Sequence, residues 1–189
     1  RLTHVAARNA NYEALLRILN DTLQGSASAD AVVLSAAANV DFGGKAIGIE
    51  SLIGSTGSDS IVGTSGAEVI AAGRDLTGTN GDTLVGAGGN DTLIGAAGND
   101  WIDASAAGNV SVDAGAGNDT VVMGSQLNAN DATLVGGDGT DYLVFADDST
   151  AGDNLSKVSG FEYISITGGV VETLTSANVL DAGATIDAS

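Results

Sequence analysis

Through the middle of the chain, single aliphatic residues alternate with polar stretches rich in Gly, Asn and Asp. Six stretches are nine residues long and share one phase, with an acid at position six and Ile, Leu or Val at position eight. They are 54-GSTGSDSIV-62, 63-GTSGAEVIA-71, 86-GAGGNDTLI-94, 95-GAAGNDWID-103, 114-AGAGNDTVV-122 and 136-GGDGTDYLV-144. Longer stretches at 72–85, 104–113 and 123–135 fill the gaps, so residues 54–144 form nine consecutive units.

Each unit predicts a turn followed by a strand. Its first half favours the positive φ and tight geometry of turns. Its second half favours a short strand with one aliphatic side chain pointing inward. Because so short a strand is unstable alone, we expect two units to make one turn of a coil, with turns stacked about 4.8 Å apart. The expected inward ladder is Ile61, Ile70, Leu84, Leu93, Ile102, Val112, Val121, Leu134 and Leu143.

These units resemble the G-G-x-G-x-D-x-U-x nonapeptide of RTX proteins, in which U is a large aliphatic residue. The best match is 136-GGDGTDYLV-144, and the resemblance covers about half of the chain. It implies an all-β fold, namely a right-handed parallel β-roll, or β-solenoid, over residues 54–144. It also implies several bound Ca²⁺ ions.

Alternate units place their turns at opposite edges of the coil, which sorts the acidic positions into two rows. The first acidic row receives Asp59, Asp82, Asp100, Asp119 and Asp141. The second acidic row receives Glu68, Asp91, Asn109 and Asp131, so one of its turns has lost its acid.

Stacked turns of this kind could bind calcium, which takes six to eight oxygen atoms at roughly 2.3–2.6 Å. Carboxylates one turn apart would repel each other without a cation between them, so we expect calcium binding and folding to depend on each other. The expected side-chain ligands are Asp59, Asp82, Asp91, Asp100, Asp119, Asp131, Asp141 and Glu68. The expected backbone-carbonyl ligands are Gly86, Gly89, Gly95, Gly98, Gly115, Gly117, Gly137 and Gly139.

The composition also points to cations. The chain has 24 Asp and Glu against 6 Lys and Arg, and its formal net charge of −18 opposes compaction. Partial disorder or bound cations would relieve this repulsion, and the regular aliphatic residues favour cations. The alternative, that the aspartates only form Asx-turns, explains one unit better than six aligned ones. Without a basic patch or an apolar run of about 20 residues, we expect neither nucleic acid binding nor membrane insertion.

The flanks predict one helix and further rungs, a rung being one turn-and-strand unit. We expect a helix over 1–24, as a cap or a docking element, then leading β rungs over 25–53 and C-terminal β rungs or a cap over 145–189. The segments 48-GIESLIGSTG-57 and 160-GFEYISITGG-169 resemble each other, and we interpret them as rungs without metal ligands. The helix is predicted from the spacing of Val5, Tyr12, Leu16, Leu19 and Leu23.

We expect no enzymatic activity from these residues. His4 is the only histidine and lies in the predicted helix, which argues against a Ser-His-Asp triad in the repeats. The stretch GAGGND lacks the lysine and the following helix of a phosphate loop. Cys is absent, so the chain has no thiol nucleophile and no thiolate zinc site.

Trp101 and Tyr142 both occupy position seven and should share one outward face. They predict either a contact surface or two isolated surface aromatics.

Together these patterns predict a structural calcium-binding module of a secreted protein at the bacterial cell surface. Calcium would trigger folding and self-assembly into a surface layer (S-layer) or an extracellular filament, as the resemblance to type I secreted proteins implies. The expected partner is a second copy of the chain, with a cell-surface glycan or lipopolysaccharide bound through other parts of the protein. The alternatives are the non-catalytic RTX region of a type I secreted enzyme, and an adhesin or ice-binding solenoid.

Overall fold

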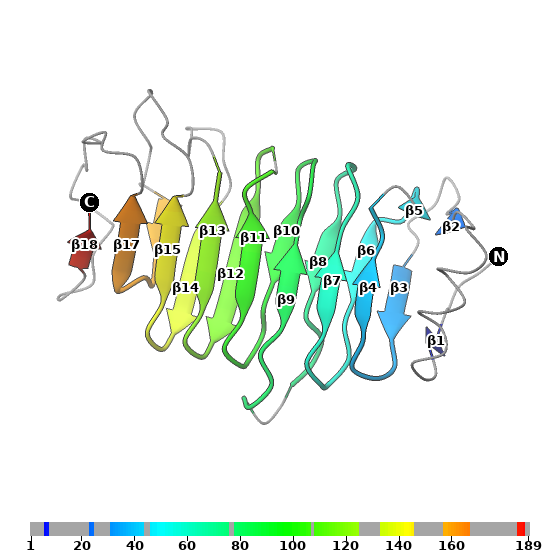
Figure 1. Ribbon diagram of the computed structural model, residues 1–189, viewed down its shortest axis with the longest axis horizontal. Helices are drawn as coiled ribbons and strands as arrows, with labels where there is room; N and C mark the ends of the chain where they lie inside the picture. The colour runs from blue at the N-terminus through cyan, green and yellow to red at the C-terminus, as the bar shows by residue number, and fades with distance from the viewer. Residues whose placement is uncertain are drawn as a thin grey trace.

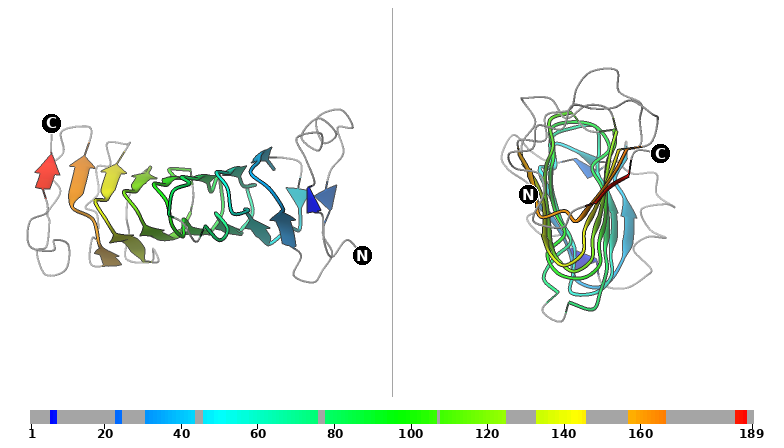
Figure 2. Two further views of the ribbon diagram at one scale, coloured as in Figure 1. Left: turned by 90° about the horizontal axis from the view of Figure 1, so that it is seen from below. Right: turned by 90° about the vertical axis from the view of Figure 1, so that its left-hand side faces the viewer.

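The computed structural model describes a coil of short parallel strands (Figure 1). The described residues are 6–7, 23–24, 31–43, 46–75, 78–106, 108–124, 133–145, 157–166 and 185–187. From β6 to β15, consecutive strands alternate between two eight-stranded sheets, so each pair of units completes one turn of the coil. Viewed along its axis, the coil is a flattened tube in which successive turns overlie one another (Figure 2, right).

The two large sheets contain parallel pairings throughout, as the sequence pattern predicts. In spatial order, sheet one comprises β1 (Ala6–Ala7), β3 (Ala31–Leu34), β6 (Ser51–Ile53), β8 (Val69–Ala71), β10 (Thr92–Ile94), β12 (Ser111–Ala116), β14 (Leu134–Asp138) and β16 (Val158–Ser159). Sheet two comprises β18 (Thr185–Asp187), β17 (Tyr163–Ile166), β15 (Tyr142–Phe145), β13 (Thr120–Met123), β11 (Trp101–Ala104), β9 (Thr83–Val85), β7 (Ser60–Val62) and β4 (Asn39–Asp41). A separate parallel pair joins β2 (Leu23–Gln24) to β5 (Ala46–Ile47).

The core lies between the sheets and consists of aliphatic ladders. All nine aliphatic residues of the predicted inward ladder are at most 1% exposed. Burying each Leu or Ile stabilises the fold by about 1.5–3 kcal/mol relative to leaving it exposed. The flanking segments extend the same ladders, because Leu52 pairs with Ile70 and Ile164 pairs with Leu143. An all-β parallel solenoid is therefore confirmed.

The helix predicted over 1–24 is not formed at the residues of that segment that the structure describes. Ala6–Ala7 pair with Val33–Leu34, and Leu23–Gln24 pair with Ala46–Ile47. An existing parallel strand presents unpaired backbone groups, and pairing with them outweighs a weak helical propensity. The rest of the predicted helix lies outside the described residues. Within the described residues, no helix is long and apolar enough to cross a membrane.

Candidate metal centre

The first acidic row runs along the turns that precede the strands of sheet two, at the lower edge of the coil in Figure 1. Each acid lies directly before a strand, and parallel pairing in register stacks it on the acid of the next turn. The N–H of Asp59 donates to Oδ1 of Asp82 at 2.5 Å, and that of Asp82 donates to Oδ1 of Asp100 at 2.7 Å. The N–H of Asp100 donates to Asp119, and that of Asp119 donates to Asp141, both at 2.8 Å. The structure therefore brings all five predicted residues of this row together.

The ladder of hydrogen bonds along this row continues beyond the nonapeptide units at both ends. Oδ1 of Asp59 accepts the N–H of Ala38 at 2.7 Å, and the N–H of Asp141 donates to Oε2 of Glu162 at 2.7 Å. Glu162 was not among the ligands predicted from the sequence. The signal was present, because Glu162 precedes the inward Ile164 by two residues, as each Asp precedes its own aliphatic residue.

The second carboxylate oxygen of several acids is buried without a hydrogen-bond partner. Such atoms are Oδ2 of Asp91, Asp100, Asp119 and Asp141. Asp119 and Asp141 are 0% exposed. A buried, unsatisfied acceptor costs about 1–3 kcal/mol, and more when it is charged. The fold thus leaves a set of oxygen atoms that a cation would satisfy.

Burial also disfavours the ionised form of these carboxylates when no cation is bound. Desolvation raises the pKa of Asp82, Asp91 and Asp119 to about 6, and that of Asp100 to about 7. It raises the pKa of Asp141 as well. The charges of neighbouring carboxylates add to this effect, while a backbone N–H donated to each Asp lowers its pKa. A bound cation would let the whole row remain ionised at neutral pH.

The glycines of the turns allow neighbouring turns to approach closely. A Cβ on Gly117, at position four, would lie 1.7 Å from the carbonyl oxygen of Gly98, and one on Gly139 would lie 1.7 Å from that of Gly117. A Cβ on Gly95, at position one, would lie 2.5 Å from Oδ2 of Asp100. A Cβ on Gly89, Gly115 or Gly137 would lie 1.7–2.0 Å from a carbonyl oxygen, and one on Gly86 would lie 2.9 Å from Oδ2 of Asp91. Backbone carbonyls and orphaned carboxylate oxygens consequently share the same narrow layer between turns.

A family model described as the RTX calcium-binding nonapeptide repeat, in four copies, matches residues 46–75, 76–106 and 105–126. The chain contains RTX calcium-binding nonapeptide repeats. RTX repeats bind calcium, and the donor set of the first row, carboxylates with backbone carbonyls, is the set that calcium prefers. The described solenoid is accordingly a calcium-binding structural module. No curated protein and no solved structure matches the chain.

Within the described residues, no group of three or more His, Cys, Asp or Glu side chains is placed to hold a metal ion. An ion between two RTX turns would therefore take one or two carboxylates and complete its shell with backbone carbonyls. The first row offers such pairs in Asp82 with Asp100, Asp100 with Asp119, and Asp119 with Asp141.

The second row of the RTX turns is shorter than its sequence suggests. The N–H of Glu68 donates to Oδ1 of Asp91 at 3.0 Å, but buried Val110 takes the acidic position in the next turn, because Thr92 pairs with Ser111. Asn109 lies one position earlier, where its N–H donates to Oδ1 of Asn90. The placement of Asn109 in the row was wrong because unit 104–113 has one extra residue. Asp131 lies outside the described residues.

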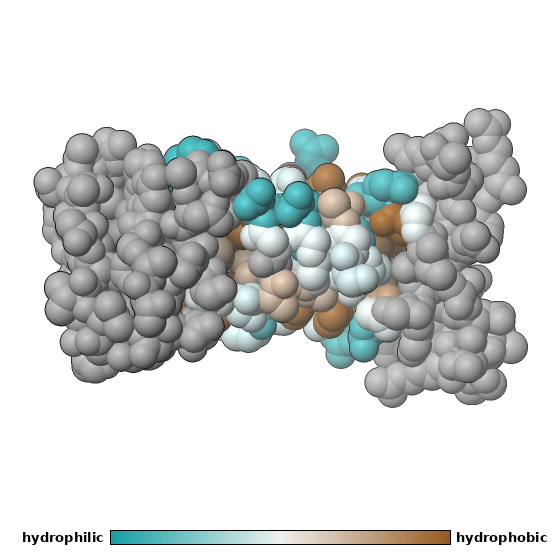
Figure 3. All heavy atoms as spheres, turned by 90° about the horizontal axis from the view of Figure 1, so that it is seen from above, coloured by the Kyte–Doolittle hydropathy of each residue, from teal (hydrophilic) through white to brown (hydrophobic). Residues whose placement is uncertain are grey.

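The turns of this second row appear in Figure 3, which views the coil from above. The described residues in view are mostly pale, with teal and brown residues scattered among them. Gly89, a predicted carbonyl ligand on this side, already accepts the N–H of Gly108 at 2.5 Å. The second row therefore offers fewer free oxygen atoms to an ion than the first.

Trp101 and Tyr142 lie on the outward face of sheet two, separated by Thr120 in the same register. Each is 43% exposed. Tyr163, which sequence analysis did not single out, continues this column and stacks on Tyr142 with ring centroids 4.6 Å apart and an interplanar angle of 9°. The two predicted aromatics are thus part of a column of three, which we call the aromatic column.

Proposed function

We propose that this chain is a calcium-dependent structural module of a secreted protein at the bacterial cell surface. Calcium outside the cell drives the repeats to fold, and the folded solenoids then assemble with one another into a surface layer or filament. The row of buried carboxylates with orphaned oxygens is the observation that carries the calcium-dependent part of this proposal.

The low-calcium state follows from the same charges. Without a cation, ionised carboxylates stacked along one edge oppose the approach of neighbouring turns. The chain would then stay loose in a calcium-poor cytosol, a state suited to passage through a secretion channel. Binding outside the cell would gather ligands from turns about 20 residues apart and close the coil in one process.

Calcium dependence is tested by titrating the calcium-free chain with CaCl₂ and following β-structure by far-UV circular dichroism. We expect most of the β-structure to appear with calcium and to be lost on chelation. A spectrum that is the same with and without a chelator would refute the calcium-dependent fold. Mg²⁺ at the same concentration serves as a control, since it prefers a tight octahedral shell with several waters.

For assembly, the aromatic column is the contact surface that we favour. Exposed aromatic side chains are enriched in protein interfaces, and here three lie in one column of a flat sheet. Electron microscopy of the calcium-bound chain should show ordered arrays or filaments. The double variant Trp101→Ser and Tyr142→Ser should remain folded but should not assemble. If the wild-type chain stays monomeric in calcium even at high protein concentration, the alternative is favoured, namely that the chain is the RTX region of a secreted enzyme or adhesin.

A further inference from the structure

The first two nonapeptide turns satisfy their own carboxylates. In the first turn, both the N–H and the hydroxyl of Ser55 donate to Oδ2 of Asp59, at 2.6 Å and 2.9 Å. In the second turn, the hydroxyl of Thr64 donates to Oε1 of Glu68, and the N–H of Thr64 donates to Oε2 at 3.1 Å. The hydroxyl oxygen in turn accepts an N–H from position four, from Gly57 at 3.2 Å and from Gly66 at 3.0 Å. We call this arrangement a closed turn.

Position two differs in the other four regular units. Ala87 and Ala96 occupy it with φ of 60° and 76°, and Gly115 and Gly137 with φ of 109° and 116°. None of these residues has a hydroxyl group, and the backbone at each is in the left-handed region. The acids of the same four units are the ones with an orphaned Oδ2 atom, namely Asp91, Asp100, Asp119 and Asp141. We call this arrangement an open turn.

The correspondence between position two and the carboxylate is complete over the six regular units. A Ser or Thr residue accompanies a satisfied acid, and a Gly or Ala residue accompanies an orphaned one. Ala87 and Ala96 make the contrast sharper, because a left-handed conformation is unfavourable for a residue with a Cβ. Strain of this kind persists where the surroundings require it, often at a ligand site. Nothing in a closed turn requires an ion.

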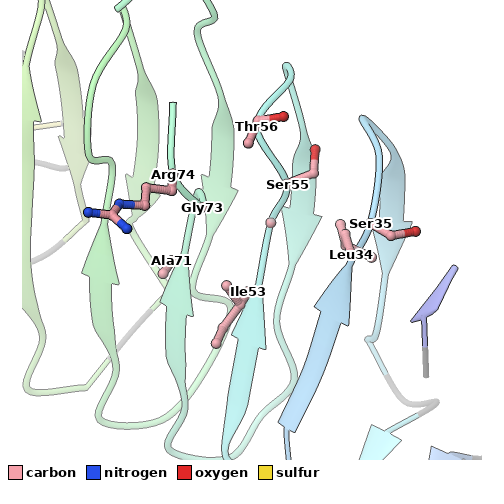
Figure 4. Close-up of a pocket in the computed structure, with 9 residues that line it drawn as sticks. Leu34, Ser35, Ile53, Ser55, Thr56, Ala71, Gly73 and Arg74 are labelled. Atoms are coloured by element: carbon pink, nitrogen blue, oxygen red, sulfur yellow. The ribbon is translucent and has the colours of Figure 1, made fainter. Parts of the chain in front are cut away.

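Closed turns also support the turns stacked next to them. The N–H of Asp59 fixes Oδ1 of Asp82, and the N–H of Glu68 fixes Oδ1 of Asp91. Ile61 and Ile70, which follow the closed turns, are 1% and 0% exposed. Figure 4 shows Ser55 and Gly73 in neighbouring turns, and a Cβ on Gly73 would lie 2.0 Å from the carbonyl oxygen of Ser55. The closed turns thus present a preformed surface to which the next turns can add.

We propose that position two decides whether a turn of this solenoid needs calcium, and that residues 54–71 form a calcium-independent seed. Ser or Thr at this position closes the turn, and Gly or Ala leaves it open to an ion. The seed holds the register of both acidic rows while the open turns from 86 to 144 acquire calcium. This inference rests on the proposed calcium binding. Each of the two tests below can contradict the inference while leaving calcium binding intact.

The first test converts one open turn of the full chain. Ala96→Ser should close the turn of Asp100 and lower the number of bound calcium ions by one, measured by equilibrium dialysis with radioactive calcium. The matched control Ala96→Gly keeps the turn open and should bind as many ions as the wild type. Equal stoichiometry in Ala96→Ser and Ala96→Gly would overturn the inference while leaving the proposed function intact. A wild-type chain that binds no calcium would overturn both.

The second test removes one closed turn and is read without calcium. Hydrogen exchange of the chelated wild-type chain should show slow amides in 60–62 and 69–71 and faster ones in 120–123 and 142–145. Ser55→Gly should abolish the protection at 60–62. Ser55→Thr keeps a hydroxyl group at this position, like that of Thr64, and should keep the protection. Uniform exchange along the chelated wild-type chain, or equal protection in the Gly and Thr variants, would contradict a seed.

Discussion

The N–H of Asp100 donates to Oδ1 of Asp119 at 2.8 Å, while Oδ2 of Asp119 is buried and has no hydrogen-bond partner. The two oxygen atoms of one carboxylate therefore have different roles. Oδ1 holds the neighbouring turn in register, and Oδ2 remains available to a cation. This division recurs at Asp141, whose Oδ1 accepts the N–H of Asp119 and whose Oδ2 is orphaned.

Asp119→Asn separates the two roles. The amide oxygen of Asn can still accept the N–H of Asp100, but the charge is lost, and calcium affinity depends on ligand charge. We expect calcium affinity, measured by isothermal titration calorimetry, to fall by about tenfold or more, roughly 1.4 kcal/mol at 25 °C. Asp113→Asn removes the same charge from an exposed residue of β12 and should change affinity little. Equal losses in the two variants would show that net charge, rather than the row, governs binding.

The two acidic rows should respond differently to truncation. Asp100→Ala removes an orphaned oxygen between two acids of the complete first row, so it should weaken calcium binding strongly. Glu68→Ala removes an acid that Thr64 already satisfies, so it should weaken calcium binding less and destabilise the calcium-free chain more. Calcium titration and urea denaturation of both variants measure these effects. Equal losses of affinity would show that the rows do not differ.

Stability of the calcium-free chain should fall as pH rises. The pKa of Asp82, Asp91 and Asp119 is raised from 3.8 to about 6 in the folded chain, and that of Asp100 to about 7. Folded carboxylates therefore hold protons that unfolded ones release, and the stabilisation is complete below the unfolded pKa and is lost as pH rises through the folded pKa values of about 6 to 7. Urea midpoints in calcium-free buffer should be higher near pH 4 than near pH 7.5. A urea midpoint that rises with pH over this range would contradict the raised pKa values of the buried carboxylates.

Calcium should reverse this dependence. Binding requires ionised carboxylates, so calcium displaces protons and its apparent affinity should increase from about pH 5 to about pH 7.5. The number of protons released per ion, measured by titration calorimetry in buffers of different ionisation enthalpy, should be greater near pH 6 than near pH 8. Proton release that does not change with pH would argue against these carboxylates as ligands.

Close stacking of turns can be tested at glycine. Gly117 has φ of 142°, and a Cβ there would lie 1.7 Å from the carbonyl oxygen of Gly98. Gly78 also has positive φ, 63°, but a Cβ there would meet nothing within 4 Å. Gly78→Ala should cost only the left-handed penalty of about 1–2 kcal/mol. Gly117→Ala should cost more, because it forces two turns apart. Thermal unfolding in calcium compares them, and equal losses would argue against tight stacking.

Local pattern was sufficient to predict the core. An aliphatic residue at position eight of each unit fixes which side chain faces inward, and parallel stacking of identical units then aligns Ile61 with Leu84 and Ile102. The first acidic row followed from the same periodicity, since each acid precedes its strand by a constant number of residues. Periodicity works here because every unit meets nearly the same neighbours.

Features that depend on distant backbone or on insertions could not be predicted in this way. Ala6–Ala7 follow a helical pattern, yet they pair with a strand more than twenty residues away, and this pairing is invisible to local spacing. Val110 displaced Asn109 from the acidic position because the sequence does not show where an extra residue is accommodated. The hydrogen bond from the hydroxyl of Ser55 to Asp59 depends on turn geometry that the residue types alone do not specify.

Alternation of strands between the two sheets has a consequence for how such a protein can change in evolution. Duplicating or deleting one nine-residue unit would move every later unit to the opposite sheet and exchange its acidic row. Asp119, for example, would leave the side of Asp100 and move with Asp141 to the opposite edge, so an ion held between Asp100 and Asp119 would lose one of its two carboxylates. Duplicating two units preserves every contact and adds one turn. The inherited module is therefore the pair of units, and gene length should vary in steps of that size.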